Sequence, residues 1–134
     1  SAEVDEILMS GGRATGVRTR DGRKFHARHA VASSTDVKQT LLGVGEGPVV
    51  SEAAARQMAH GVRERLGADI GLSLTGVAGP DAQDGQPVGT VFMGLVGPGF
   101  DDVRHARLPG QREQMRQFSV ITALGHLRTA LAAR

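Results

Sequence analysis

A hydroxyl, two glycines and a proline lie together near the middle of the chain, in the run Thr75-Gly76-Val77-Ala78-Gly79-Pro80. Glycines at the end of a strand permit positive φ angles and let a ligand approach backbone N–H groups closely. In an open α/β sheet, ligands bind in the crevice beyond the carboxyl ends of the strands. The run therefore predicts a cradle for a small molecule or a phosphate, with an ordinary strand-to-strand connection as the alternative.

The residues on either side of this run predict the strands that position it. Residues 69–75 alternate large apolar side chains with glycine or hydroxyl-bearing ones, the two-residue period of a strand. Residues 88–96 follow as a long, mostly apolar strand. After a turn at residues 97–99, residues 102–108 alternate in a way that is typical of a half-exposed edge strand, antiparallel to its neighbour.

Amphipathic helices are expected before and after these strands in the chain. Ser51 is the expected N-cap of a helix over residues 52–66, which ends at Gly67. A shorter helix is expected to begin at Thr35 or Asp36 and to carry Lys38. The last helix is expected over residues 111–132, with one apolar stripe buried: Met115, Phe118, Ile121, Leu124, Leu127 and Leu131.

The first part of the chain, residues 2–33, predicts a β-meander of four short strands. Asp21-Gly22 is a strong signal for a two-residue hairpin turn. No helix pattern follows Ser10-Gly11-Gly12, so these residues predict a turn and not a phosphate-binding loop. With the later helices and strands, the order of elements predicts a layered α/β or α+β domain.

Composition excludes several classes of function. The chain of 134 residues has 40% hydrophobic residues and a net charge of +2, which fits a single globular domain. Its arginines are interspersed with acids and it has no Trp or Tyr, so nucleic-acid binding is not expected. No cysteine is present, which suits the cytoplasm. The absence of cysteine also excludes a cysteine-based metal site. We expect no signal peptide and no membrane span.

Several motifs together resemble one family. Residues 31–44, VASSTDVKQTLLGV, resemble the VxYSNxxKxxLLGV segment of the CinA C-terminal domain family, the nicotinamide mononucleotide amidohydrolases. The runs TGVAGP at residues 75–80, PVGTV at residues 87–91 and PGQR at residues 109–112 agree with the same family, in its order. The resemblance covers residues 31–134 and implies a three-layer α/β/α sandwich that hydrolyses a carboxamide without a metal or other cofactor.

The resemblance also implies roles for individual residues. Lys38 is implied as the base that activates a serine nucleophile, a use for which a desolvated neutral amine is suited. Thr75 is implied as the contact to the reacting amide or to the oxyanion. Arg112 or Arg116 would neutralise the phosphate. The loop residues implied to bind the nucleotide are Gly76, Ala78, Gly79, Pro80, Gly89 and Thr90.

The sequence departs from the family at the nucleophile. The family's AESCTGG strand–turn–helix is absent, and the substitutes we consider are Ser10, Ser33 and Ser34. Residues 1–36 resemble instead the β-meander of phytoene-desaturase-like FAD oxidoreductases, without their GxGxxG unit. The chain is therefore interpreted as one α/β domain and a possible chimera, with a flavoprotein-like segment at residues 1–30 in place of the first strand and helix.

Three hypotheses follow for function. The first is a nicotinamide mononucleotide amidohydrolase-like domain, impaired because the serine motif is missing. The second is a non-catalytic domain of the same fold that binds a nucleotide or forms oligomers. The third is a fragment of an FAD oxidoreductase. The expected partners are nicotinamide mononucleotide and a second copy of the chain, as a homodimer, with no nucleic acid and no membrane.

Overall fold

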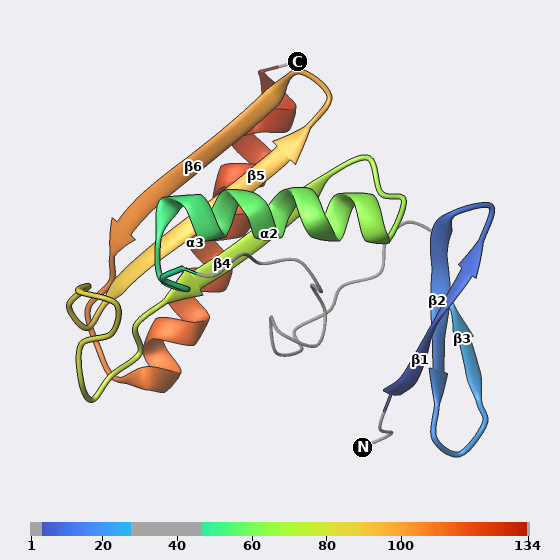
Figure 1. Ribbon diagram of the computed structural model, residues 1–134, viewed down its shortest axis with the longest axis horizontal. Helices are drawn as coiled ribbons and strands as arrows, with labels where there is room; N and C mark the ends of the chain where they lie inside the picture. The colour runs from blue at the N-terminus through green and yellow to red at the C-terminus, as the bar shows by residue number, and fades with distance from the viewer. Residues whose placement is uncertain (1–3, 28–46, 134) are drawn as a thin grey trace.

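The computed structural model describes residues 4–27 and 47–133. Within these ranges it contains two three-stranded antiparallel sheets and two helices (Figure 1). Ser33, Ser34, Lys38, the expected helix around Lys38 and the expected fourth strand of the meander lie outside the described residues. The elements in chain order are β1 (Val4–Ser10), β2 (Arg13–Thr19), β3 (Lys24–His26), α2 (Glu52–Arg65), β4 (Gly71–Gly76), β5 (Thr90–Gly97), β6 (Phe100–Arg107) and α3 (Arg112–Ala132).

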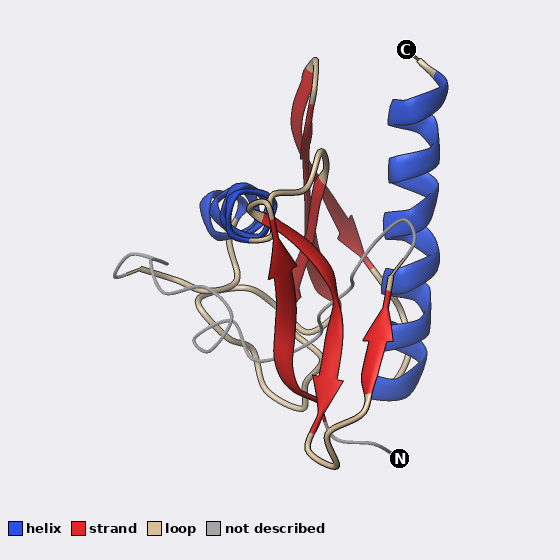
Figure 2. Ribbon diagram, turned by 90° about the vertical axis from the view of Figure 1, so that its right-hand side faces the viewer, coloured by secondary structure: helices blue, strands red, loops and turns tan. Residues whose placement is uncertain are grey.

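The second sheet lies between the two helices. Its strands follow the order β4-β5-β6, and both pairs are antiparallel, so the predicted edge strand is confirmed as β6. Helix α2 covers one face and α3 crosses the other, as Figures 1 and 2 show from two directions. The described part of the chain therefore has the expected mixed α/β architecture, with helices on both faces of an antiparallel sheet.

Helix α2 begins and ends where its sequence signals predict. The Ser51 side-chain oxygen accepts a hydrogen bond from the Ala54 N–H group at 3.1 Å, which satisfies one of the free donors of the first turn. At the other end Gly67 has a φ of +56°, a left-handed conformation that stops the helix. The buried side chains of α2 are Ala54, Ala55, Met58 and Ala59.

The backbone of α2 lies unusually close to the sheet. A Cβ atom added to Gly71 would come within 2.0 Å of the Ala59 carbonyl oxygen, and one on Gly94 within 2.3 Å of the Ala55 carbonyl oxygen. Ser73, which pairs with Gly94 across the sheet, donates a buried hydrogen bond of 2.6 Å from its hydroxyl to the Ala55 carbonyl. Because glycine and serine leave room for the helix, this face of β4 and β5 is packed by backbone rather than by large side chains.

Helix α3 packs on the sheet through Met115, Ala123 and His126, so the predicted buried stripe is wrong for most of its members. Met115 and Ala123 are buried against Val91 and Met93, but Ile121 is 67% exposed. Large apolar side chains of α3 point away from the sheet instead: Phe118, Val120, Ile121, Leu124 and Leu131. The stripe is apolar as predicted, but most of it faces away from the sheet, because periodicity alone does not say which side of a helix faces its neighbour.

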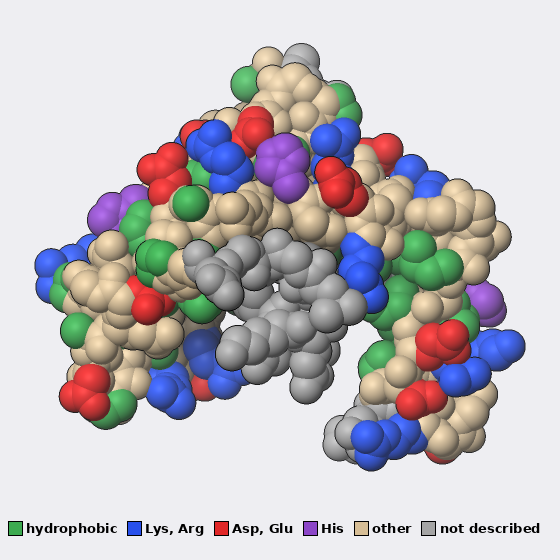
Figure 3. Space-filling model, in the orientation of Figure 1, with side chains coloured by type: hydrophobic (Ala, Val, Ile, Leu, Met, Phe, Trp, Pro, Cys, Tyr) green, Lys and Arg blue, Asp and Glu red, His purple; other side chains and the backbone are tan. Residues whose placement is uncertain are grey.

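The meander forms a sheet of its own, with the order β1-β2-β3. The predicted hairpin is present, but its turn has three residues instead of the predicted two, because Thr19 pairs with Arg23. Gly22 closes it with a φ of +85°, and its N–H group donates to the Thr19 carbonyl at 2.8 Å. This sheet meets the end of α2, where the Ala14 N–H group donates to the Leu66 carbonyl at 2.8 Å. The space-filling view shows acidic and basic side chains interspersed over α2 and the meander, without a single-sign patch on that face (Figure 3).

An exposed ion pair joins the meander to the residues that precede β4. The Arg13 guanidinium contacts the Asp69 carboxylate at 3.1 Å, and their side chains are 57% and 75% exposed. The hydrogen bond from Arg13, and then the positive charge of Arg13, hold the pKa of Asp69 below its ordinary value. A carboxyl with a lowered pKa in the folded state adds stability above its unfolded pKa, and this contribution is lost as the pH falls through the folded value. Solvent exposure keeps the contribution small.

We predict that Arg13→Ala raises the pKa of Asp69 toward that of a free aspartate, since the two largest effects that lower it, a hydrogen bond and a charge, both come from Arg13. The measurement is a pH titration of the side-chain carboxyl carbon by NMR. Arg23→Ala is the matched control: it removes the first cause that lowers the pKa of Asp21 and should leave Asp69 unchanged. An Asp69 titration that is the same in Arg13→Ala and the unmodified protein would contradict the contact.

Candidate functional site

The run at residues 75–80, here called the glycine loop, leaves the end of β4 beside the start of β5. The Val77 N–H group donates to the Thr90 carbonyl at 2.9 Å, and the Gly89 N–H group donates to the Val77 carbonyl at 2.9 Å. The end of β6 joins them, because the Leu108 N–H group donates to the Gly89 carbonyl at 2.8 Å. One end of the sheet thus gathers the glycine loop, the start of β5 and the chain that enters α3.

Arg112 reaches the glycine loop from the first turn of α3. Its Nη2 donates a hydrogen bond of 2.8 Å to the Gly79 carbonyl, across 33 residues of sequence. A guanidinium has five N–H donors and no acceptor, so this bond leaves most of its donors for other groups. Arg116 lies one turn further along α3 and is exposed, and among the described residues it makes no hydrogen bond to the loop. The structure therefore brings Arg112, rather than Arg116, onto the loop.

Thr75 is buried at the end of β4, with 8% of its surface exposed. Its Oγ1 donates a hydrogen bond of 2.7 Å to the Val49 carbonyl. A hydroxyl has one proton and two lone pairs, so Thr75 can still accept a hydrogen bond but has no second proton to donate. Thr90, the first residue of β5, is 1% exposed, and the residue of β5 that pairs with Thr75 is Phe92.

The segment just before α2 is tied to the same end of the sheet. The Val49 carbonyl accepts the hydrogen bond from Thr75, and the next residue, Val50, donates a hydrogen bond of 2.9 Å from its N–H group to the Asp84 carboxylate. Asp84 and Gly85 have φ angles of +52° and +73° in a tight turn of the loop between β4 and β5. Sequence reasoning missed Val49 and Asp84, although the Asp84-Gly85 pair is itself a turn signal. Residues 49 and 50 therefore lie against Thr75 and against the turn at Asp84.

The glycines of this region serve close packing. Gly79 and Gly89 have φ angles of +79° and +97°, which L side chains rarely adopt. A Cβ atom on Gly89 would lie 2.6 Å from the Leu108 carbonyl oxygen, and one on Gly76 would lie 2.6 Å from the Thr90 carbonyl oxygen. Ala78 is half-buried and Pro80 is exposed. Close contacts with neighbouring backbone therefore restrict the loop to one conformation.

A cavity of about 500 Å³ lies away from the glycine loop, between α3 and the turn from β5 to β6. Among residues 4–27 and 47–133, no three His, Asp or Glu side chains gather in a way that could hold a metal ion. In the same residues no helix is both long and apolar enough to cross a membrane.

The chain shares sequence with curated bacterial proteins. A CinA-like protein of Frankia casuarinae is 48% identical over 107 residues, which are 76% of this chain and 25% of that protein. A CinA-like protein of Gloeobacter violaceus is 42% identical over 134 residues, 93% of this chain and 32% of that protein. The chain thus spans about a quarter to a third of the length of these relatives.

Solved structures and a family match agree with these relatives. The crystal structure of a competence or damage-inducible protein from Enterobacter asburiae superposes with a TM-score of 0.65 at 29% identity, covering 75% of this chain and 67% of that one. The competence damage-inducible protein A of Klebsiella pneumoniae gives a TM-score of 0.61 at 33% identity, covering 65% and 55%. Residues 15–131 match the family described as CinA C-terminal domain, so the match begins within the meander. The chain belongs to the CinA C-terminal domain family.

Proposed function

We propose that this domain binds nicotinamide mononucleotide at the glycine loop and is a nicotinamide mononucleotide amidohydrolase of impaired turnover. The observation that carries the proposal is the hydrogen bond from Arg112 to the Gly79 carbonyl. It supports a phosphate site because a guanidinium held at a glycine-rich loop offers further N–H donors and a positive charge in the same place. Arg116, one turn along α3, is the second cation proposed for the phosphate.

Thr75 suits the carboxamide end of this ligand. Its proton is engaged by the Val49 carbonyl. We therefore assign it as an acceptor for a carboxamide N–H group rather than as a donor to an oxyanion. The loop residues Gly76, Ala78, Gly79, Pro80, Gly89 and Thr90 would enclose the nucleotide between these two ends.

The proposed chemistry needs a serine and Lys38. The neutral Lys38 amine takes the proton of the serine hydroxyl while the serine oxygen attacks the carboxamide carbon. The C–N bond then breaks as the leaving nitrogen takes that proton back from Lys38 and departs as ammonia. Water hydrolyses the acyl-enzyme to the mononucleotide acid and restores the serine hydroxyl. Ser33 and Ser34 are the proposed nucleophiles because they precede Lys38 closely in the chain. Ser10 is less suited, since it ends β1 in the separate sheet of the meander.

Two readouts test the proposal. Calorimetric titration with nicotinamide mononucleotide should show saturable binding that weakens about tenfold in Arg112→Ala, the size expected for one charge-assisted hydrogen bond. Arg116→Ala is the matched control and should weaken binding less, because Arg116 does not contact the loop. Ammonia release should be slow and should fall about 100-fold further in Lys38→Ala, as for loss of a general base.

The outcomes separate binding from turnover. Absence of saturable binding would refute the site at the glycine loop. Binding without ammonia release, or release that Lys38→Ala leaves unchanged, would refute the Ser–Lys mechanism and leave the non-catalytic nucleotide-binding domain.

A second candidate function, self-association, is favoured by the outer face of α3. Ile121 is 67% exposed and Leu124 is 55% exposed, next to Phe118 at 43%. Contiguous exposed apolar side chains of this kind are typical of an interface. We propose that two copies of the chain form a homodimer through this face of α3.

The dimer is tested by sedimentation velocity. Ile121→Asp should convert the dimer to a monomer, because it places a charge at the centre of the apolar face. Gln117→Asp is the control, since residue 117 is a polar, exposed position of the same helix. A monomeric unmodified protein, or a dimer that survives Ile121→Asp, would contradict this use of the face.

A further inference from the structure

Strand β6 forms an open edge of the second sheet. It runs beside β5 for eight residues without an interruption in register. In the part of the chain that the structure describes, no strand pairs with its other side, and Figure 1 shows β6 as the outermost strand. An edge strand of this kind presents a row of N–H and C=O groups that can pair with a strand of another chain.

The backbone groups of alternate residues of β6 point away from β5. Just beyond the strand, the Leu108 N–H group donates to the Gly89 carbonyl at 2.8 Å, so at residue 108 the backbone points toward β5. This direction alternates along an antiparallel strand. The outward-pointing N–H and C=O groups of β6 are therefore those of Asp101, Val103, His105 and Arg107.

The side chains of β6 are complementary to a second copy of the same strand. Asp101 and Asp102 are followed by Val103, and then by Arg104 and His105. When two copies pair antiparallel about a two-fold axis at Val103, Asp102 of each copy lies opposite Arg104 of the other. In the same register, Asp101 of each copy lies opposite His105 of the other. The strand thus matches acidic positions with basic ones at both ends of the pairing.

Neighbouring registers lack this match. A two-fold axis at Asp102 or at Arg104 would place two identical charges directly opposite each other, which destabilises a strand pair. An axis at Val103 places a half-buried apolar side chain beside its own copy instead. Because Val103 points its backbone groups outward, it can also exchange hydrogen bonds with its copy in this register.

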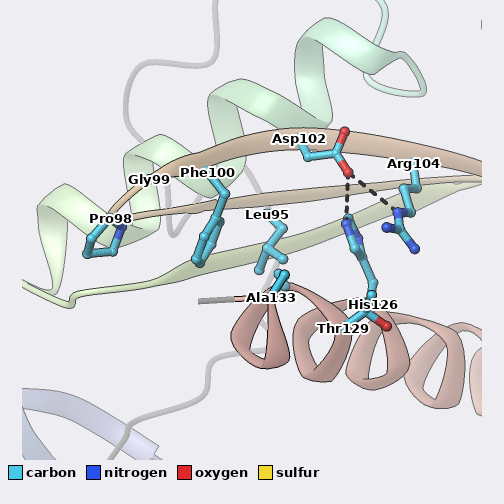
Figure 4. A pocket seen from close by; sticks show the side chains of 10 residues that line it. Leu95, Pro98, Gly99, Phe100, Asp102, Arg104, His126, Thr129 and Ala133 are labelled. Atoms are coloured by element: carbon cyan, nitrogen blue, oxygen red, sulfur yellow. Dashed lines mark hydrogen bonds and ion pairs between the residues drawn. The ribbon is translucent and has the colours of Figure 1, made fainter.

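The chain itself holds two of these charged side chains in place. Asp102 Oδ2 lies 3.0 Å from Nε2 of the buried His126 on α3 and 3.4 Å from Nε of Arg104, as the dashed lines of Figure 4 show. The Asp102 and Arg104 side chains are still 53% and 50% exposed, so each has room for a partner from a second copy. Because their own chain already restricts them, little conformational entropy is lost when that partner binds.

We propose that the two copies of the homodimer pair along β6, antiparallel and centred on Val103, so that their three-stranded sheets join into one of six strands. This inference rests on the dimer proposed at the outer face of α3. The C-terminal half of α3 adjoins β6 through His126, so one two-fold axis beside the edge can serve both contacts. Exposed ion pairs add little affinity. The edge therefore sets the register of the dimer, and the apolar face of α3 supplies most of its affinity.

A single introduced cysteine tests this register, because the chain has no cysteine of its own. In the proposed pairing the Cα atoms of residue 103 in the two copies lie about 5.5 Å apart, within the range that a disulfide spans. His105→Cys is the matched control on the same face of the strand. It lies opposite Asp101, so the Cα atoms of residue 105 in the two copies are about 14 Å apart. Under mild oxidation, Val103→Cys should form about tenfold more linked dimer than His105→Cys on non-reducing electrophoresis.

A charge reversal tests the side-chain pairs. Arg104→Asp should raise the dissociation constant of the dimer about tenfold in sedimentation velocity, because it places a carboxylate opposite Asp102 of the other copy. Arg107→Asp is the control. Arg107 is also exposed on β6, but in this register it lies opposite Gly99, so its substitution should leave the dissociation constant unchanged.

The results separate this pairing from the contact at α3. Absence of linkage in Val103→Cys, equal linkage in His105→Cys, or a dimer that Arg104→Asp does not weaken would overturn the pairing along β6. If Ile121→Asp nevertheless abolishes the dimer, only the β6 pairing is refuted and the α3 interface stands. Linkage specific to Val103→Cys in a protein whose dimer survives Ile121→Asp would support the β6 pairing and refute the α3 interface.

Discussion

The close approach of the α2 backbone to the glycines of the sheet is the contact on which the rest of the structure depends. At Gly71 and Gly94 the helix carbonyls of Ala59 and Ala55 occupy the space that side chains would need. The Ser73 hydroxyl then bonds one of those carbonyls within the buried layer. This packing fixes where α2 starts relative to β4. It thereby fixes the positions of Val49 and Val50. Val49 accepts a hydrogen bond from Thr75, and Val50 donates one to Asp84 in the connection between β4 and β5.

The opposite face of the sheet is contacted by side chains of a helix and not by its backbone. There α3 meets the strands through Met115, Ala123 and His126, and the space beside its C-terminal half is left open. The same orientation sends Ile121 and Leu124 outward. One rotation of a helix about its axis thus accounts for three features: the cavity, the buried His126–Asp102 pair, and the apolar face proposed for a second copy.

Short-range sequence signals predict much of the fold. The Ser51 cap, the Asp21-Gly22 turn and the alternation along β4 depend on neighbours in sequence, and each was found where it was predicted. The buried side of α3 was not predicted correctly. It depends on how the helix packs on the sheet, and the apolar periodicity of the helix carries no information about that packing. The Asp102–His126 contact and the Asp84 contact to Val50 join elements far apart in the chain, and no spacing rule reports them. The resemblance of residues 75–80 and 109–112 to one family, by contrast, predicts that the glycine loop and Arg112 lie together, and the hydrogen bond from Arg112 to the Gly79 carbonyl confirms that proximity.

The most direct test of this account is the free energy of unfolding of Gly94→Ala, measured by urea denaturation. A Cβ atom there would meet the Ala55 carbonyl at 2.3 Å and the Ser73 hydroxyl at 2.7 Å, so we predict a loss of about 1–3 kcal/mol from overpacking. Gly125→Ala on α3 meets nothing within 4 Å and should instead stabilise the protein by about 0.5–1 kcal/mol. A Gly94→Ala variant as stable as the unmodified protein would contradict the account.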